Sequence, residues 1–565
     1  MSATSGGGQR PVAVVTGGGG GIGRAVAEEL GRTGYLVVTL DPLVAVDGGD
    51  QAPTPEPTTA ERIVAAGGSA RASAVSVTDR DAVRQLFAGL VDEHGRLDAV
   101  VNVAGITRPT GFARGSEDDW HAVLSVHLDG YLNVLGAALP LMAATSGGRI
   151  LGVTSGSGWR QADAGAYACA KRAVAALTWQ LAGQLPSGVV LNAMSPIAAT
   201  RMVTAALGRA RTPGAGPTPG AGTATTASGG LSLGSMPAPE EIGPMGAHLV
   251  AEAFSWCRGQ VIFAGGSEAA VIDRPRLVEV VRTGGVADLP HLFDTWCSGA
   301  LVHAEADQAT SGGSNPRFPD LFDATGEAPP APATNCAIVS DRAELRAAVA
   351  TALDARGVTV EVLPIDTGPA SFERAAAMVH STVEGGRPLD ALVVALDGGG
   401  PASAATTWER VLAEHSDLAV GIHTDAAWAR AIAGHAKATD RPVRLVTLTD
   451  GRGSGGRSRA QASAQLARSA RTATRDLVSA FAISVEAREP HRLGAVGELA
   501  AHLVCGSGIE GLSGAELVVG DGWVGLRRHP RPIGSVTYGG PDVPTWMDDA
   551  LRDIVGGAGG DGSGA

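Results

Sequence analysis

The sequence predicts an α/β protein with two tandem domains, each built on a doubly wound parallel sheet. First, 565 residues exceed what one ordinary hydrophobic core organises. Second, apolar runs such as Val12–Thr16 and Leu36–Leu40 alternate with helix-like stretches such as Arg24–Thr33. Continuous apolar strands separated by helices are typical of a parallel sheet covered on both faces. Third, the same alternation begins again after Asn335.

The first series of elements extends over about residues 10–283. Its further expected elements are the strands Leu97–Val103, Arg149–Thr154 and Val189–Ala193, the helix Glu240–Ala253 and the strand Gly259–Ala264. A low-complexity stretch at 208–235, rich in Gly, Pro and Thr, cannot pack a core. We therefore expect a mobile lid or insertion over about residues 203–236.

The second series of elements repeats the first. RLDAVVNVAG (96–105) parallels PLDALVVALDG (388–398), GRILGVTSGSG (148–158) parallels VRLVTLTDGRG (443–453), and GQVIFAGG (259–266) parallels GAELVVGDG (514–522). These pairs indicate a tandem duplication. The expected division is a first domain at 10–283, a linker at 284–333, a second domain at 334–530 and a tail at 531–565.

The composition argues against several classes of function. The formal net charge of −13 disfavours nucleic acid as a partner. No apolar run approaches the ~18 residues that span a bilayer, and residues 1–10 lack the pattern of a signal peptide. The five cysteines are scattered and form no CxxC pair, which favours reduced thiols and disfavours a metal site. We expect a cytoplasmic protein with no membrane partner and no metal.

A glycine-rich loop, TGGGGGIG at 16–23, lies between the first expected strand and helix. Glycines let backbone N–H groups approach a pyrophosphate, and the start of a helix favours its negative charge. A glycine run alone also fits a plain turn, but this placement favours a dinucleotide site. The residues expected to bind the cofactor are Thr16, Gly17, Gly21, Ile22 and Gly23.

Asp41 ends the second expected strand. A carboxylate there can accept both ribose hydroxyls of NAD and would repel the 2′-phosphate of NADP. The alternative is an aspartate that only caps the turn. We expect NAD rather than NADP.

Four further motifs follow in order. They are NVAG at 102–105, Ser155 after a strand, YACAK at 167–171 and NAMSP at 192–196. Together with the glycine loop, they resemble the short-chain dehydrogenase/reductase family over roughly residues 10–280, which implies Rossmann-like domains. His127 and the segment NAMSPIAATRM (192–202) are similar to the branch with (3R)-hydroxyacyl-CoA dehydrogenase and 3-oxoacyl reductase domains.

The resemblance implies a catalytic set. Tyr167 would exchange a proton with the substrate oxygen while hydride moves to or from the nicotinamide. A free tyrosine has a pKa of about 10, and Lys171, one helical turn later, would favour the phenolate and hold the ribose. Ser155 would hydrogen-bond the reacting oxygen. The alternative, a half-buried aromatic beside a surface charge, is weak because the chain has only four tyrosines and two lysines.

Three features depart from the family's pattern. Ser155 and Tyr167 are one residue closer than usual, so Thr154 and Ser157 are alternative hydroxyls. His127 replaces the asparagine of the proton relay, where it would bind a relay water, titrate, or be a satisfied buried histidine. Isoleucine follows Pro196 where glycine is usual. The resemblance also places Asn102, Ala104, Gly105, Tyr167, Lys171, Pro196 and Thr200 at the cofactor.

The second domain lacks the corresponding chemistry. VSDRAE at 339–344 replaces the glycine loop, LDGG at 396–399 replaces the NAG motif, and residues 461–469 contain neither tyrosine nor lysine. We expect this domain to fold, to bind no dinucleotide, and to occupy the place of a partner subunit. Two chains would then form a homodimer resembling the family's tetramer. WVGL at 523–526 serves either that packing or the core.

The expected activity is NAD-dependent hydride transfer between the nicotinamide and a carbonyl or hydroxyl carbon. The resemblance favours a 3-oxoacyl or 3-hydroxyacyl thioester, free or bound to a carrier. The long lid would also suit a polyketide, a steroid or another bulky carbonyl. A non-catalytic nucleotide sensor is the remaining alternative, but a sensor has no need of Tyr167 and Lys171.

Overall fold

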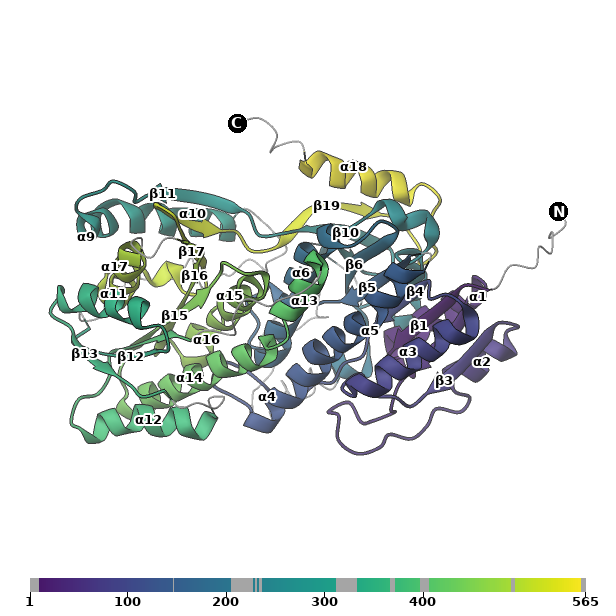
Figure 1. Cartoon of the computed structure of the whole chain (residues 1–565), viewed down its shortest axis with the longest axis horizontal. Helices are drawn as coiled ribbons and strands as arrows, with labels where there is room; N and C mark the ends of the chain where they lie inside the picture. The colour runs from purple at the N-terminus through teal and green to yellow at the C-terminus, as the bar shows by residue number, and fades with distance from the viewer. Residues whose placement is uncertain are drawn as a thin grey trace.

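The computed structural model describes residues 10–145, 147–204, 227–228, 231–232, 236–310, 333–365, 371–396, 406–488 and 493–559. Two large, mostly parallel sheets of nine and eight strands lie side by side, each with helices on both faces (Figure 1). The doubly wound α/β architecture with two Rossmann-like domains is thereby confirmed. Most of the expected lid at 203–236 lies outside the described residues.

The first sheet has the strand order β19–β10–β9–β6–β5–β4–β1–β2–β3. Its strands are β1 (Val12–Thr16), β2 (Leu36–Leu40), β3 (Ser69–Ser73), β4 (Ala99–Asn102), β5 (Gly148–Val153), β6 (Val189–Pro196), β9 (Val261–Ala264), β10 (Glu268–Asp273) and β19 (Arg531–Thr537). The strand order reverses between β1 and β4, and a crevice for a ligand forms at such a point.

The helices of the first domain cover both faces of this sheet. They are α1 (Gly21–Arg32), α2 (Thr59–Ala65), α3 (Arg80–His94), α4 (Glu117–Leu124), the π-helical turn η1 (Ser125–Asp129), α5 (Gly130–Ala144), α6 (Gly165–Leu181) and α8 (Gly243–His248). Shorter 3-10 turns are η2 (Gly156–Gly158), η3 (Ala182–Gln184), η4 (Pro239–Glu241) and η5 (Glu252–Trp256). The helix expected over Glu240–Ala253 is therefore broken into η4, α8 and η5.

One stretch of these helices is long and apolar. In the described part of the chain, Glu117–Ala144 is the single helix that could cross a membrane by length and composition, and 61% of its most apolar window is buried inside the fold. Packing against other elements accounts for its apolar character. The expected absence of a membrane partner stays a prediction.

The second sheet has the order β11–β18–β17–β16–β15–β14–β12–β13. Its strands are β11 (Leu277–Arg282), β12 (Asn335–Ser340), β13 (Thr359–Val362), β14 (Ala391–Ala395), β15 (Val443–Asp450), β16 (Val478–Val485), β17 (Glu516–Gly520) and β18 (Trp523–Arg527). The helical elements from here to the C-terminus are α9 (Leu289–Leu292), η6 (Phe293–Cys297), α10 (Ser298–Thr310), α11 (Ala343–Asp354), α12 (Phe372–Glu384), α13 (Thr407–Glu414), α14 (Leu418–Thr439), α15 (Ser454–Ala467), α16 (Ala470–Thr474), α17 (Leu493–Cys505), η9 (Glu510–Leu512) and α18 (Met547–Gly559).

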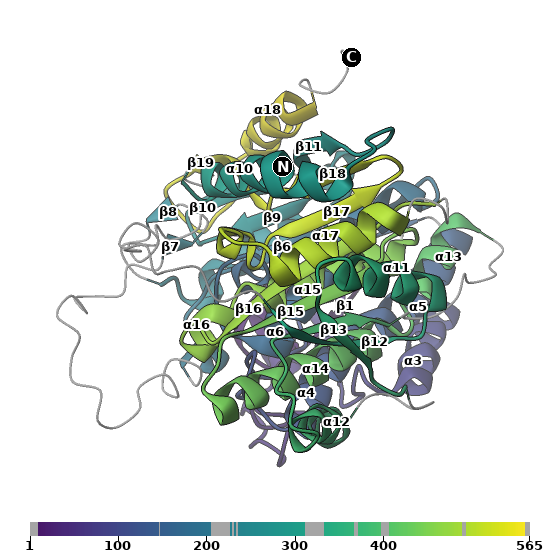
Figure 2. The same cartoon turned by 90° about the vertical axis from the view of Figure 1, so that its left-hand side faces the viewer.

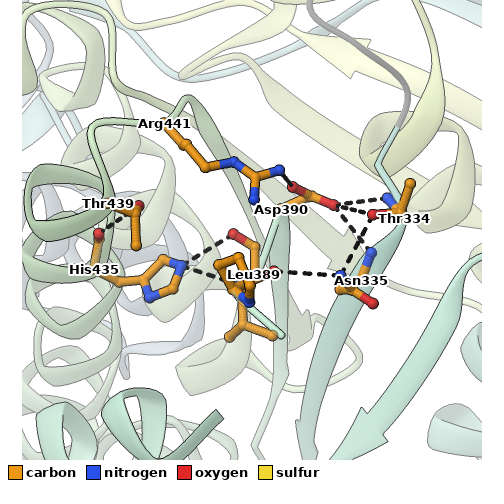
Figure 3. A network of polar contacts seen from close by, with 8 residues as sticks. Thr334, Asn335, Leu389, Asp390, His435, Thr439 and Arg441 are labelled. Atoms are coloured by element: carbon orange, nitrogen blue, oxygen red, sulfur yellow. Dashed lines mark hydrogen bonds and ion pairs between the residues drawn. The ribbon is translucent and has the colours of Figure 1, made fainter. Parts of the chain in front are cut away.

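The repeat seen in the sequence is also a repeat of local contacts. In the first domain, Asp98 Oδ2 accepts a hydrogen bond of 2.8 Å from the backbone N–H of Val12, where β1 begins. In the second, Asp390 Oδ2 accepts bonds of 2.8 and 3.1 Å from the N–H groups of Thr334 and Asn335, where β12 begins (Figure 3). The aspartates of RLDAVV and PLDALV thus satisfy the same backbone donors, because each lies beside the first strand of its domain.

Each domain extends its last strands into the other sheet. β10 belongs to the first sheet and β11, directly after it, pairs with β18 in the second. β19, which follows β18, returns to pair antiparallel with β10. In Figure 1, β10 with β11 and β18 with β19 run along one edge of both sheets. The expected boundary near residue 283 therefore follows β11, which lies in the second sheet. The expected boundary near residue 530 precedes β19, which lies in the first sheet.

The segments expected as linker and tail are partly helical. Phe293, Cys297 and Leu301 of the linker are buried in the core of the second domain. Met547 and Leu551 of the tail are buried in the core of the first. The division into domains, linker and tail did not predict these helices: apolar residues spaced by four, the period of one helical face, were the overlooked signal.

The two domains pack through the helices that flank the catalytic motif. α15 lies along α6, and α14 packs against α4 and α6, as Figures 1 and 2 show from two sides. One hydrophobic cluster contains Trp120 and Cys169 of the first domain together with Trp428 and Ala462 of the second. The WVGL segment forms β18, where Val524 and Leu526 are buried, so it belongs to the core of the second domain.

Candidate active site

A cavity of about 840 Å³ extends from the glycine loop to α6. Gly17, Gly21 and Asp41 line one end, and Tyr167 and Lys171 line the other. β1, β2, β5 and α6 supply these residues from distant parts of the chain, because the carboxyl ends of parallel strands meet at one edge of the sheet. The structure thus brings the expected cofactor and catalytic residues into one space.

The glycine loop has a backbone that only glycine adopts easily. Gly17 and Gly21 have positive φ values of 66° and 52°. A Cβ atom on Gly23 would collide with the carbonyl oxygen of Gly17, so this glycine permits the tight turn into α1. Gly17, Gly21 and Ile22 line the cavity, whereas Gly23 acts from behind it. The loop fits a pyrophosphate, which the start of α1 and its free N–H groups would hold.

Thr16 and Asn102 lie behind the cavity wall. The Thr16 hydroxyl donates a 2.9 Å hydrogen bond to Asn102 Oδ1 and accepts one of 3.1 Å from the N–H of Ala104. Both side chains are buried, and neither lines the cavity. Ala104 and Gly105, which do line it, are held in place by these bonds. Thr16 and Asn102 therefore support the site rather than contact a cofactor directly.

Asp41 caps its turn and faces the cavity at the same time. Its Oδ2 accepts a 2.9 Å hydrogen bond from the N–H of Gly19, and its Oδ1 accepts one of 2.8 Å from the N–H of Leu43. A carboxylate oxygen has a second lone pair, so both oxygens can still accept from a ribose hydroxyl. The capping and cofactor roles that the sequence left as alternatives are compatible.

Tyr167 and Ser155 face each other in the cavity. Burial raises the pKa of the Tyr167 phenol above its usual value of 10.0, and a hydrogen bond with Ser155 acts in the opposite direction. Thr154 donates its hydroxyl to the carbonyl of Lys171 at 2.5 Å and is buried, so it is not available to a substrate. The geometry favours Ser155 over Thr154 despite the shortened spacing.

Lys171 lies below the tyrosine on the same helix. Its Nζ donates a 2.7 Å hydrogen bond to the carbonyl of Val153 and lies 5.7 Å from the centre of the Tyr167 ring. Burial lowers the pKa of Lys171 to about 7. In its charged form the ammonium favours the phenolate, and ribose hydroxyls that accept from it would stabilise that form. The expected pair is assembled, with a lysine whose charge depends on pH near neutrality.

His127 lies in the π-helical turn η1 with its ring edge-on to Tyr167, at a centroid distance of 5.1 Å. Its Nε2 lies 2.7 Å from the carbonyl oxygen of Ile106 and 3.1 Å from the backbone nitrogen of the same residue. The first contact needs a proton on Nε2 and the second needs a lone pair there, so either tautomer makes one of the two bonds. Burial, with Lys171 as a second cause, lowers the pKa of His127 to about 3. A pKa this low disfavours titration near pH 7, which is one of the three alternatives that the sequence left open for His127.

Nδ1 of His127 is the nitrogen that could bind a relay water. Nδ1 is buried and has no hydrogen-bond partner within the described ranges. Nε2 is therefore the ring nitrogen of this histidine that protein groups satisfy in the described part of the chain. Binding of a relay water at Nδ1 stays a prediction.

Pro196 and Thr200 line the cavity after β6. The Thr200 hydroxyl accepts a 3.2 Å hydrogen bond from the N–H of Val203, at the start of a short helical turn. Sequence reasoning missed three arginines of the cavity wall, Arg108, Arg160 and Arg201. Arg201 Nη2 would lie 3.3 Å from a Cβ on Gly20, so this arginine reaches over the glycine loop.

The corresponding place in the second domain is filled by charged side chains. Asp450 ends β15 and accepts a 2.9 Å hydrogen bond from Arg452 Nε, while Arg342 Nη1 lies 3.9 Å from its other oxygen. α15 has neither tyrosine nor lysine. Of the LDGG segment, residues 397–399 lie outside the described residues.

Comparison with known proteins places this site in a family. The family model described as short chain dehydrogenase matches residues 11–209. A 3-oxoacyl-[acyl-carrier-protein] reductase of Synechocystis is 37% identical over 187 residues, which cover 33% of this chain and 72% of that protein. The chain belongs to the short-chain dehydrogenase/reductase family. It is an NAD(P)-dependent oxidoreductase acting on CH–OH or C=O groups.

This short-chain dehydrogenase/reductase is also similar to a mouse enzyme and to a solved structure. The peroxisomal multifunctional enzyme type 2 of Mus musculus is 36% identical over 205 residues, covering 35% of this chain and 26% of that enzyme. The structure of the N-domain with NADP of bacterial malonyl-CoA reductase matches 90% of this chain and 97% of its own, with a TM-score of 0.64 and 19% identity. That likeness shows that the fold of nearly the whole chain, both sheets included, occurs in another protein.

Proposed function

We propose that this enzyme transfers hydride between NAD and the 3-carbonyl or 3-hydroxyl carbon of an acyl substrate, with a 3-oxoacyl thioester as the expected form. The observation that carries the proposal is the meeting of Ser155, Tyr167 and Lys171 with the glycine loop in one cavity. A sensor of nucleotides would have no use for the acid-base pair.

Each catalytic side chain has one task in this proposal. The nicotinamide, when bound, supplies or accepts the hydride. Ser155 donates a hydrogen bond to the reacting oxygen and stabilises its developing negative charge. Tyr167 gives that oxygen a proton during reduction and removes it during oxidation. The ammonium of Lys171 lowers the energy of the phenolate that remains.

The preference for NAD rests on Asp41. Its carboxylate lines the cavity beyond the glycine loop and accepts hydrogen bonds from ribose hydroxyls. The 2′-phosphate of NADP would meet a negative charge there, which disfavours that cofactor.

The substrate class rests on similarity to the reductase from Synechocystis, whose name states a 3-oxoacyl group on acyl carrier protein. The wall near Tyr167 is apolar, with Trp159, Phe263 and Ile272. This wall would also accept a bulkier carbonyl such as a polyketide or a steroid. A substrate screen therefore has to include these compounds.

The second domain has a supporting role in the proposal. Its α15 packs along the helix that carries Tyr167 and Lys171, where the family usually places a partner subunit. We further propose a homodimer of these chains, located in the cytoplasm. Titration of the whole chain with NADH in a calorimeter should give one equivalent bound; two equivalents would contradict the inactive second domain.

The test of the function is a screen of acyl thioesters, polyketide-like ketones and steroids with NADH and NADPH. The Tyr167→Phe variant should lose about 10²- to 10⁴-fold in kcat for the best substrate while it still binds NADH. Tyr35→Phe, a tyrosine outside the cavity, is the matched control. Turnover of the best substrate by Tyr167→Phe at the wild-type rate would overturn the proposed mechanism.

A further inference from the structure

Arg160 lies beside the catalytic serine in the segment that joins β5 to α6. Its guanidinium folds back over Gly156, the residue after Ser155. A Cβ atom on Gly156 would lie 3.2 Å from both Cζ and Nε of this arginine and 3.4 Å from its Nη2. Since consecutive Cα atoms are about 3.8 Å apart, and Ser155 and Arg160 line the same cavity, the guanidinium lies within about one residue of the serine.

The positive charge of Arg160 has no protein counterpart within the described ranges. Its Nε is buried without a hydrogen-bond partner, and burial lowers the pKa of the guanidinium with no carboxylate opposing the effect. The nearby carboxylate of Asp163 is already bound by Arg114 and by the N–H of Phe112. An unpaired, partly buried cation costs free energy, and an anionic ligand that pairs with Arg160 would offset this cost.

The charges of the cavity are unequally distributed. Of the described residues that line it, Asp41 is the single acidic side chain, and it lies at the far end, beyond the glycine loop. Arg160 and Lys171 line the end with the catalytic residues, and Arg108 and Arg201 are the other lysines or arginines of the cavity wall. In a chain with 57 acidic residues, this end of the cavity is electropositive and suits an anionic substrate.

The backbone of Arg160 is fixed from two sides. Its N–H donates a 3.0 Å hydrogen bond to the carbonyl of Gly156, and its own carbonyl accepts one of 2.7 Å from Gln465 Nε2 of α15. Gln465 also donates to the carbonyl of Ser157 at 3.1 Å. The second domain therefore holds the turn that presents this arginine, which preorganises the guanidinium.

We propose that Arg160 binds a carboxylate of the substrate, and that the substrate is a short oxo acid or hydroxy acid. The planar guanidinium matches a carboxylate with two parallel hydrogen bonds. The carboxylate would lie within a few bonds of the reacting carbon, because Arg160 is adjacent to Ser155. A coenzyme A phosphate lies at the far end of its pantetheine arm and does not reach this position when the acyl carbonyl is at Ser155. This inference rests on the proposed reaction and replaces the expected thioester by a free acid.

The test compares acetoacetate, its neutral methyl ester and acetoacetyl-CoA as substrates of the full chain with NADH. Wild-type enzyme should reduce acetoacetate with the highest kcat/KM. In Arg160→Gln, kcat/KM for acetoacetate should fall about 10- to 100-fold, and that for the ester should fall far less. Arg84→Gln, which removes an exposed arginine of α3 and the same charge, is the control.

A second measurement does not depend on turnover. Succinate should raise the melting temperature of the wild-type complex with NAD and fail to do so for Arg160→Gln. The inference is overturned if Arg160→Gln affects acid and ester equally and succinate stabilises both proteins alike, or neither. If wild-type enzyme then still reduces acetoacetyl-CoA and Tyr167→Phe does not, the proposed function is kept and only the role of Arg160 is rejected. If no compound of the wider screen is reduced in a Tyr167-dependent way, the proposed function itself fails.

Discussion

Arg172 of the catalytic helix forms a buried ion pair with Glu516 of the second domain. Nη2 of the arginine lies 2.8 Å from Oε2 of the glutamate, and the two side chains are 1% and 2% exposed. Gln461 of α15 accepts a further 3.1 Å hydrogen bond from Nε of Arg172. Because Arg172 directly follows Lys171, the second domain holds α6 in place beside the residues Tyr167 and Lys171.

Removal of one member of this pair should destabilise the whole chain. Arg172→Met leaves the buried Glu516 with only the more distant Arg527, at 3.8 Å, and Glu516→Gln leaves the buried Arg172 without a carboxylate. Breaking a buried pair costs about 3–5 kcal/mol, and the arginine left by Glu516→Gln should show the larger loss. Urea unfolding followed by tryptophan fluorescence measures the loss. The double variant Arg172→Met/Glu516→Leu, which removes both charges, should be more stable than either single variant. Single variants as stable as the wild type would contradict a structural role for the pair.

Lys171 should make the stability of the ligand-free protein depend on pH. Burial lowers its pKa from 10.5 to about 7, so between these values the unfolded chain binds more protons than the folded one. The contribution of this lysine to stability is lowest below pH 7 and rises with pH. The gain in unfolding free energy on Lys171→Met should therefore be largest near pH 6 and shrink toward pH 9. The exposed Lys437 serves as control, and a gain that is constant over this range would refute the reasoning.

Gly23→Ala should abolish dinucleotide binding. The added Cβ would collide with the Gly17 carbonyl oxygen and push the loop out of shape. We expect the dissociation constant for NADH to rise at least about 100-fold, a loss of about 3 kcal/mol. Gly89→Ala in α3, where a Cβ meets open space, should leave binding intact and stabilise the helix by about 0.5–1 kcal/mol. Equal NADH affinities for Gly23→Ala and wild type would show that the loop does not hold the pyrophosphate.

Asp41 should set the choice of cofactor. Wild-type kcat/KM should be at least about tenfold higher with NADH than with NADPH, because like charges close together cost several kcal/mol. Asp41→Ser should lower the value for NADH and raise that for NADPH. A wild-type preference for NADPH would refute the assignment. Asp41→Ser also removes the carboxylate that accepts from the N–H groups of Gly19 and Leu43. Its melting temperature therefore has to be measured, to separate a loss of stability from a change in cofactor preference.

Much of the site could be predicted from the sequence because its motifs are local. The glycine loop and the pair Tyr167 and Lys171 each act through neighbours within one strand–helix turn or one turn of helix. The repeat was visible for the same reason, since equivalent strands keep their apolar patterns. The assignment of Ser155 over Thr154 needed coordinates, because neighbouring residues of one strand end point in different directions.

Other features depended on burial and on contacts across the chain. The sequence left three roles open for His127, and the burial that lowers its pKa comes from an environment assembled by β4, η1 and α6. The helices of the linker and of the tail pack into the cores of the second and the first domain, respectively. No local pattern told which domain Phe293 or Met547 would pack against.

The sequence by itself predicted the repeat and the residues of the catalytic set, and it determined that the second half has no glycine loop and no tyrosine–lysine pair at the matching positions, because local propensity and spacing encode these features. Only the tertiary structure decided that the two halves exchange strands and share a core. It alone showed that Arg172 joins the catalytic helix to Glu516, and that Arg160 stands without a counter-charge in the described part of the chain. Such pairings join residues hundreds of positions apart, and they depend on which surfaces are buried together.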